Sequence, residues 1–166
     1  MATSSGDEVD HVVGDWRREL PGLDVSSAAI VVPVTRLAAL LSERRAAVLA
    51  PHGLDQSHLD VLGVLLRSGR PYRLTAGELS RRCRVTAGAT TQRVTAMEGL
   101  GLVERSREPE DRRTVNVALT AAGQNRLREV LGDVVTADEA VLSGLSVAER
   151  QMLETALRAW MSHTPE

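Results

Sequence analysis

The chain has 166 residues, of which 43% are hydrophobic and 25% charged, a balance typical of a globular protein of about one domain. No apolar run approaches the ~20 residues that a membrane-spanning helix needs, and residues 1–10 resemble neither a signal peptide nor a transit peptide. The single cysteine, Cys83, excludes an intrachain disulfide, so we expect a protein of the reducing cytoplasm.

Two helices are predicted in the first 50 residues. Over residues 7–20, Val9, Val12, Val13 and Trp16 recur at helical spacing, and a Pro-Gly pair ends the helix. A longer apolar helix is predicted over residues 26–50. Pro33 lies inside this segment, so it should kink the helix or mark its true start.

The middle of the chain predicts three helices in succession. The first covers residues 55–67 and begins at Asp55 or Ser57, both of which are good N-caps. A capping box that begins at Thr75 predicts a short helix ending near Cys83. Thr86 is expected to cap a third helix that ends near residue 100.

The hydrophobic pattern then changes from helical to alternating. Residues 102–105 and 114–119 predict two strands, and the charged turn 106–113 joins them in a β-hairpin. Thr120 is expected to cap a helix over residues 121–141, and a capping box at Ser146 opens a last helix that ends near residue 161. The predicted fold is mainly α with one small β-hairpin.

Charge is distributed unevenly along the chain. All 20 basic residues are arginines, and residues 67–113 carry eleven of them against six acidic residues, a net charge of +5, whereas the rest carries −7. This basic middle indicates a face that meets a polyanion, although a solvated arginine-rich surface is the alternative.

The order helix, short helix, turn, helix, hairpin is the plan of a winged helix-turn-helix. In such a fold the helix after the turn, here the one that Thr86 is expected to cap, enters the major groove of DNA, and its N-terminal residues contact the base edges. An arginine at the hairpin tip can enter the neighbouring minor groove, where A·T-rich stretches concentrate negative potential. The sequence therefore predicts binding to double-stranded DNA.

Four segments resemble the MarR family of bacterial transcription regulators. They are Leu59-Asp60-Val61-Leu62, residues 74–79, Glu110-Asp111-Arg112-Arg113, and residues 117–123 with their Leu-Thr-x-x-Gly. The resemblance implies a winged helix-turn-helix repressor that works as a homodimer on a pseudo-palindromic operator. It also implies an N-terminal extension over residues 1–24, a helical dimerisation region over 25–54 and 121–166, and a DNA-binding region over 55–120.

Carried over to this sequence, the resemblance assigns DNA contacts in the wing. Arg113 matches the wing-tip arginine that enters the minor groove, and Asp111 matches the carboxylate that holds this arginine in place. Arg112 is better placed for a phosphate.

The resemblance also assigns contacts at the recognition helix. Four residues fall on its groove-facing part: Ala87, Gly88, Thr91 and Gln92. The amide of Gln92 is suited to pair with adenine, whereas Arg84 and Thr86 are better placed for phosphate. For any single arginine, a solvated side chain is the alternative.

A narrower resemblance, to the urate-responsive, PecS-like branch of the family, rests on Trp16, Asp60, Arg93 and Arg105. It implies that urate binds against Trp16 with Arg93 as counter-charge. The anion would then force Asp60 to move, to break a pairing with Arg105 or to take up a proton. Each position has an alternative: Trp16 as a packing anchor, Asp60 as a partner of any arginine, and Arg105 as a solvated strand residue. Arg93 lies at the edge of a predicted buried stripe, which favours a ligand or coupling role.

Other function classes are less well supported by the residues. No catalytic nucleophile set, phosphate loop or cysteine-rich metal site is readable, so we expect neither an enzyme nor a cofactor. His52 and His58 are the two histidines that a turn could bring together, and a zinc-responsive regulator is a weak alternative. Two alternatives for the signal stay open. The regulator could respond to another aromatic or phenolic anion, or to oxidation of Cys83, which lies between Arg82 and Arg84.

Overall fold

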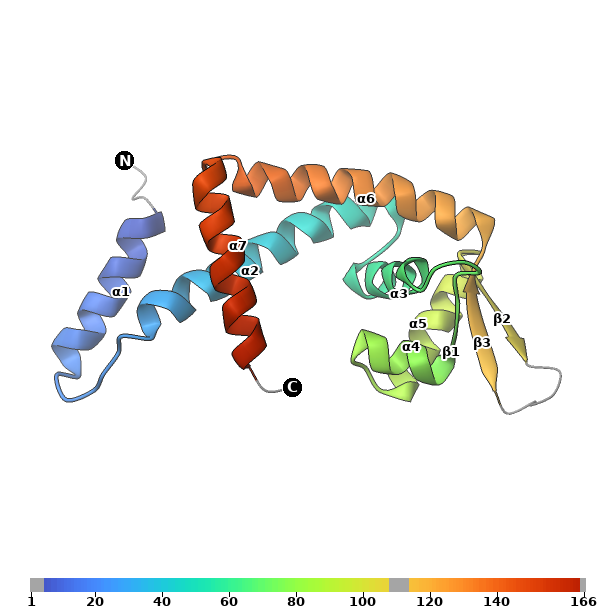
Figure 1. Ribbon diagram of the computed structural model, residues 1–166, viewed down its shortest axis with the longest axis horizontal. Coiled ribbons are helices and arrows are strands. Elements are labelled where there is room, and N and C mark those ends of the chain that lie inside the picture. The colour runs from blue at the N-terminus through green and yellow to red at the C-terminus, as the bar shows by residue number, and fades with distance from the viewer. Residues whose placement is uncertain (1–4, 108–113, 165–166) are drawn as a thin grey trace. The chain divides into compact units, whose positions relative to one another are not determined.

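A computed structural model describes residues 5–107 and 114–164, with side chains from residue 11 onward (Figure 1). The chain divides into two compact units, Met1–Arg44 and Arg45–Glu166, and the division falls within one helix, α2 (Ala28–Leu49). Each unit is described by itself.

The first unit contains α1 (Ser5–Glu19) and most of α2. Val13 of α1 is buried together with Val25 and Ala28, which precede and begin α2. Both predicted helices are confirmed. Pro33 does not mark the start of α2, because the helix begins five residues before it and continues through it.

The second unit contains the other helices. A short 3₁₀ turn (Ala50–His52) is followed in chain order by α3 (Gln56–Arg67), α4 (Ala76–Cys83), α5 (Ala87–Gly99), α6 (Ala121–Leu142) and α7 (Val147–His163). The predicted caps are confirmed, because the side chain before each helix accepts a backbone N–H of its first turn.

The strands form one antiparallel sheet in the order β1-β3-β2. β2 (Val103–Arg107) and β3 (Val115–Leu119) are the predicted hairpin strands, with Arg105 paired to Val117. β1 (Arg73–Thr75) was not expected, and it pairs with β3 on the other side. Three residues are too few to show an alternating pattern.

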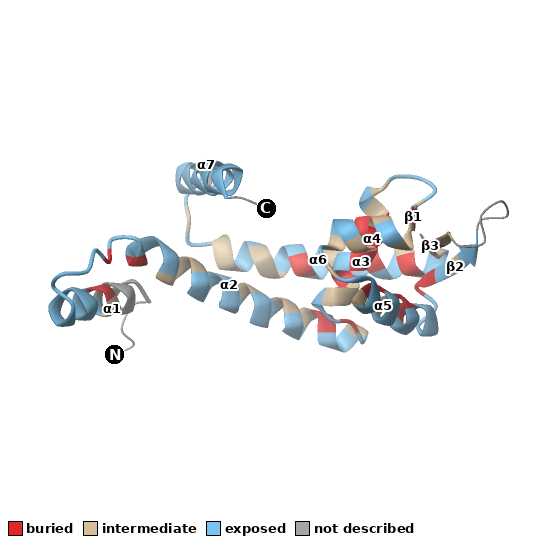
Figure 2. Ribbon diagram, turned by 90° about the horizontal axis from the view of Figure 1, so that it is seen from below, coloured by how far each residue is buried: buried red, intermediate tan, exposed pale blue. Residues whose placement is uncertain are grey.

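The core of the second unit surrounds α3. Leu62 and Leu65 of α3 are fully buried, as are Leu79 of α4, Met97 of α5 and Leu127 of α6. Figure 2 shows red, buried segments on α3, α4, α5 and α6, whereas α7 has the colour of exposed residues. No residue of α7 is buried, although all of its residues are described. Within the described ranges, no helix combines the length and apolar character that crossing a membrane requires.

The Leu-Thr-x-x-Gly segment joins the sheet to α6. The hydroxyl of Thr120 donates to the carbonyls of Gly101 and Leu102, at 2.7 and 3.2 Å, and also accepts from the N–H of Gly123. A Cβ at Gly123 would overlap the carbonyl of Leu102. The first turn of α6 therefore approaches the backbone before β2 so closely that only glycine fits.

Candidate nucleic-acid interface and adjacent pockets

Two polar contacts fix the turn between α4 and α5. Arg84 ends α4 in the left-handed conformation, with φ of 54°, and Thr86 then caps α5 through a 3.2 Å hydrogen bond from the N–H of Ala89. The hydroxyl of Ser80 donates to that of Thr90 at 2.8 Å. Because Thr90 is only 2% exposed, this bond ties the two helices together in the interior.

The two faces of α5 are clearly different. Thr90, Val94 and Met97 are buried, which confirms the predicted stripe. The four positions predicted to meet the groove are all exposed: Ala87, Gly88, Thr91 and Gln92. Ala87, Gly88 and Thr91 are small, so they leave the N-terminal half of α5 open to close approach by another molecule.

An open groove of about 600 Å³ lies beside the start of α5. Arg81, Arg84 and Thr86 are among the residues that line it. Arg81 was not assigned from the sequence, although the arginine cluster at the end of α4 was a signal for it. The dipole at the N-terminus of α5 and these guanidinium groups make the groove favourable for phosphate.

The wing is described only along its strands. Asp111, Arg112 and Arg113 lie outside the described residues. Their assigned roles stay predictions.

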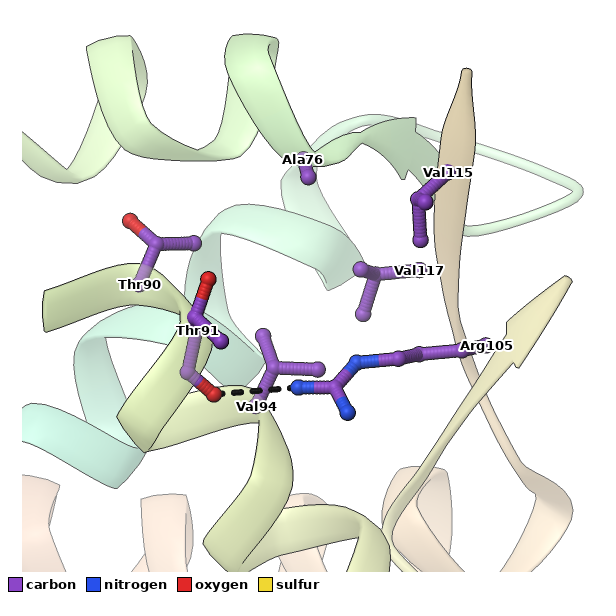
Figure 3. Close-up of a pocket in the computed structure, with 7 residues that line it drawn as sticks. All are labelled: Ala76, Thr90, Thr91, Val94, Arg105, Val115 and Val117. Atoms are coloured by element: carbon purple, nitrogen blue, oxygen red, sulfur yellow. Dashed lines mark hydrogen bonds between the residues drawn. The ribbon is translucent and has the colours of Figure 1, made fainter. Parts of the chain in front are cut away.

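Arg105 joins the wing to the recognition helix. From β2, its guanidinium donates to the Glu98 carboxylate at 3.1 Å, the Thr91 carbonyl at 3.0 Å and the Thr95 hydroxyl at 2.7 Å. It also lines a pocket of about 280 Å³ between α5 and the sheet, where Figure 3 shows it directed toward Thr91. Arg105 is therefore a bridging residue rather than a solvated one.

The predicted pairing of Asp60 with Arg105 is wrong. The carboxylate partner of Arg105 is Glu98, on the last turn of α5, whereas Asp60 lies on α3 and accepts from the Gln56 amide at 2.8 Å. The sequence did not reveal Glu98 as a partner, because the contact depends on how β2 lies against α5.

Asp60 lines a separate pocket of about 450 Å³ between α3, α6 and the end of α2. At its edge, Nε and Nη2 of Arg45 donate to the two carboxylate oxygens of Asp138, at 3.0 and 2.6 Å. These bonds raise the pKa of Arg45, and the charge of Asp60 acts in the same direction. The volume is in the usual range of small-molecule sites.

Asp60 and Arg93 act on the same sulfur atom. Burial raises the pKa of the Cys83 thiol, the charge of Asp60 raises it further, and the charges of Arg93 and Arg67 oppose the shift. The net shift of the Cys83 pKa is upward, so the surroundings as a whole disfavour the thiolate, although the arginine charges favour it. Asp60 of α3 and Arg93 of α5, two predicted ligand residues, therefore both act electrostatically on a side chain of α4.

The remaining predicted residues have separate surroundings. Trp16 is 45% exposed and belongs to the first unit. His52 lies 3.2 Å from Asp133, whereas His58 completes the capping box of α3. Among the side chains that the structure describes, no three potential metal ligands come together.

The chain is similar to characterised regulators over most of its length. The MarR family profile matches residues 52–114. The transcriptional regulator PecS of Dickeya dadantii is 28% identical over 150 residues, which cover 90% of each chain.

Solved structures share the fold. AbsC of Streptomyces coelicolor, a MarR family transcriptional regulator, superposes with a TM-score of 0.73 at 22% identity over 85% of this chain and 95% of its own. MepR of S. aureus, solved as a DNA complex, gives 0.71 at 16% identity over 81% and 98%. These similarities show that the chain has the winged helix-turn-helix fold of these regulators and that residues 52–114 match the MarR family.

Proposed function

We propose that this protein is a homodimeric transcriptional repressor that binds double-stranded DNA and is released by a small organic anion, with urate as the best candidate. The observation that carries the proposal is the exposed, small-residue face of α5 beside a wing strand that Arg105 holds in place. The similarity to PecS over 90% of both chains supports the urate response.

DNA recognition divides between base contacts and phosphate contacts. Gln92 and Thr91 are exposed on α5 and are assigned to base edges in the major groove. Arg84 and Arg81 line the groove beside the start of α5 and are assigned to phosphates. In the wing, Arg113 is assigned to the minor groove, Asp111 to the positioning of Arg113, and Arg112 to phosphate.

Ligand binding is assigned to Trp16, Asp60 and Arg93, with Arg105 as the coupling residue. An anion beside Asp60 changes the charge balance of the cluster that also contains Arg93, and Arg93 belongs to α5. The effect reaches the DNA-binding face because a ligand shifts an equilibrium by its different affinity for the two states. Arg105 then transmits the change between α5 and the wing through Glu98 and Thr91, not through Asp60.

The experiment is a titration of the protein against a duplex operator selected from a random library, followed by fluorescence anisotropy. We expect affinity that falls as salt rises, and a further loss of about 5–150-fold when urate is added. Gln92→Ala should weaken selected sites more than random ones, whereas Arg84→Ala should weaken both equally. If the protein showed no salt-dependent binding to duplex DNA, the proposal that it is a DNA-binding regulator would be contradicted. Release by salicylate and not by urate would contradict the urate assignment alone.

A further inference from the structure

One face of α3 carries a polar stripe along the Asp60 pocket. Gln56, Asp60, Gly63 and Arg67 follow one another at spacings of four, three and four residues, so they lie on one side of the helix, and all of them line the pocket. Leu59, Leu66 and Val134 supply apolar lining beside them. The pocket thus combines apolar surface with charges of both signs.

Two guanidinium groups line this pocket, and only one is engaged. Arg45 donates two hydrogen bonds to the carboxylate of Asp138. Arg67 has neither a hydrogen bond nor an ion pair with any residue in the described ranges, and it is exposed to solvent. Arg67 is therefore the cation that an incoming anion can use without breaking an existing pair.

Gly63 determines where the head of Arg67 lies. Gly63 is buried, and a Cβ built on it would lie 3.0 Å from Nη1 of Arg67. The arginine side chain thus folds back along α3 by one turn, and its guanidinium rests on the glycine. This close approach presents the guanidinium to the pocket.

We propose that Arg67 binds the charged edge of a planar organic anion in the Asp60 pocket, a role that rests on the proposed ligand response. A planar guanidinium donates two parallel hydrogen bonds to adjacent acceptor atoms on one edge of a ring. The apolar side chains cover the ring, and Asp60 accepts from N–H groups on another edge. The site selects heterocyclic anions that carry both kinds of edge, and urate is one of them.

The test is calorimetric titration of urate into the full-length protein without DNA. Arg67→Ala should weaken urate binding by about 10–100-fold, because it removes a charge-assisted hydrogen-bond pair. Arg67→Lys, which keeps the charge but not the planar pair, should give an intermediate loss. Arg70→Ala is the matched control: it removes the same charge from the exposed turn after α3 and should bind urate like the wild type.

Gly63→Ala tests the position of the guanidinium independently. The added methyl group displaces the head of Arg67, so urate binding should weaken, by less than in Arg67→Ala. The melting temperature should not fall, since alanine favours a helix more than glycine does.

The outcomes separate this inference from the proposed function. If the wild type binds urate and Arg67→Ala binds it as tightly as Arg70→Ala does, the role of Arg67 is overturned and the urate response stands. If the wild type shows no saturable binding of urate, both fall. Salicylate, which lacks ring N–H groups, should bind more weakly than urate, and equal binding would overturn the assigned class of ligand.

Discussion

At the scale of single residues, Asp60 and Arg105 serve different elements. Arg105 holds β2 against α5 through three acceptors on that helix. Asp60 acts on Arg45 at one side and on Cys83 at the other. In the proposed function, a ligand at Asp60 acts on α5 through the charges around Cys83 and Arg93, and on the wing through Arg105.

The reactivity of Cys83 reports on this cluster. The Asp60 charge raises the pKa of the thiol, so Asp60→Asn should lower the pKa and speed alkylation by iodoacetamide at pH 8, because the thiolate is the reactive form. Arg93→Ala should slow alkylation, since it removes a charge that favours the thiolate. Glu129→Gln, an exposed change on α6, should leave the rate unchanged. If neither Asp60→Asn nor Arg93→Ala changed the alkylation rate, the charges of these two residues would not act on the Cys83 thiol.

The bridge from Arg105 to Glu98 predicts coupled substitutions. Arg105→Ala and Glu98→Gln should each weaken operator binding and reduce the effect of urate on it. Their combination should cost less than the sum of the two, with a coupling energy of about 0.5–1 kcal/mol, because the pair is partly exposed. The measurement is a double-mutant cycle on operator affinity. Glu104→Gln, on the same strand and exposed, is the control, and additive effects would exclude the bridge as a coupling element.

At the scale of elements, local signals in the sequence were sufficient for the helices. Each cap acts on a backbone group three residues away, so Thr75, Thr86, Thr120 and Ser146 could be assigned without any tertiary contact. The buried stripe of α5 followed from helical spacing in the same way.

Features that depend on distant contacts could not be predicted as well. β1 forms because Leu74 pairs with Val117, 43 positions away in the sequence. A strand of three residues carries no local pattern from which this pairing could be predicted. The partner of Arg105 depends on the position of β2 beside α5. For the proposed ligand pocket, the sequence pointed to Asp60 but not to Arg67, since the orientation of Arg67 depends on a glycine one turn before it.

The junction between β2 and α6 predicts a large difference between two glycines of one helix. Gly123→Ala should destabilise the protein by about 1–3 kcal/mol, because its methyl group overlaps the carbonyl of Leu102. Gly132→Ala has open space around the new Cβ and should instead stabilise α6 by about 0.5–1 kcal/mol. Urea denaturation measures both free energies of unfolding. Similar values for the two variants would mean that the backbone approach at Gly123 is not tight.

At the scale of the whole molecule, the apolar surface of α7 requires an explanation. Leu153, Leu157 and Trp160 recur at helical spacing, yet each of them is at least 39% exposed in the single chain. Contiguous exposed apolar surface of this kind marks an interaction site. The proposed homodimer provides the cover, since a second copy brings the same surface to a two-fold axis.

Charges placed on this surface should separate the dimer. The double substitution Leu153→Asp with Leu157→Asp removes two leucines from each copy, and each is 39% exposed in the single chain. Burying that remaining surface contributes about 0.6–1.2 kcal/mol per leucine, so the dissociation constant should rise by about 10²–10³-fold. Light scattering should then report a monomer at micromolar concentration, and operator affinity should fall because one copy contacts only one half-site of a pair about 10 bp apart. Gln151→Asp with Thr155→Asp adds the same charge on the other side of α7, where both residues are exposed, and should leave the dimer intact. A wild-type monomer would contradict the proposed assembly. A dimer that survives Leu153→Asp with Leu157→Asp would move the interface away from α7, to the exposed apolar residues of α2 such as Ile30 and Leu37.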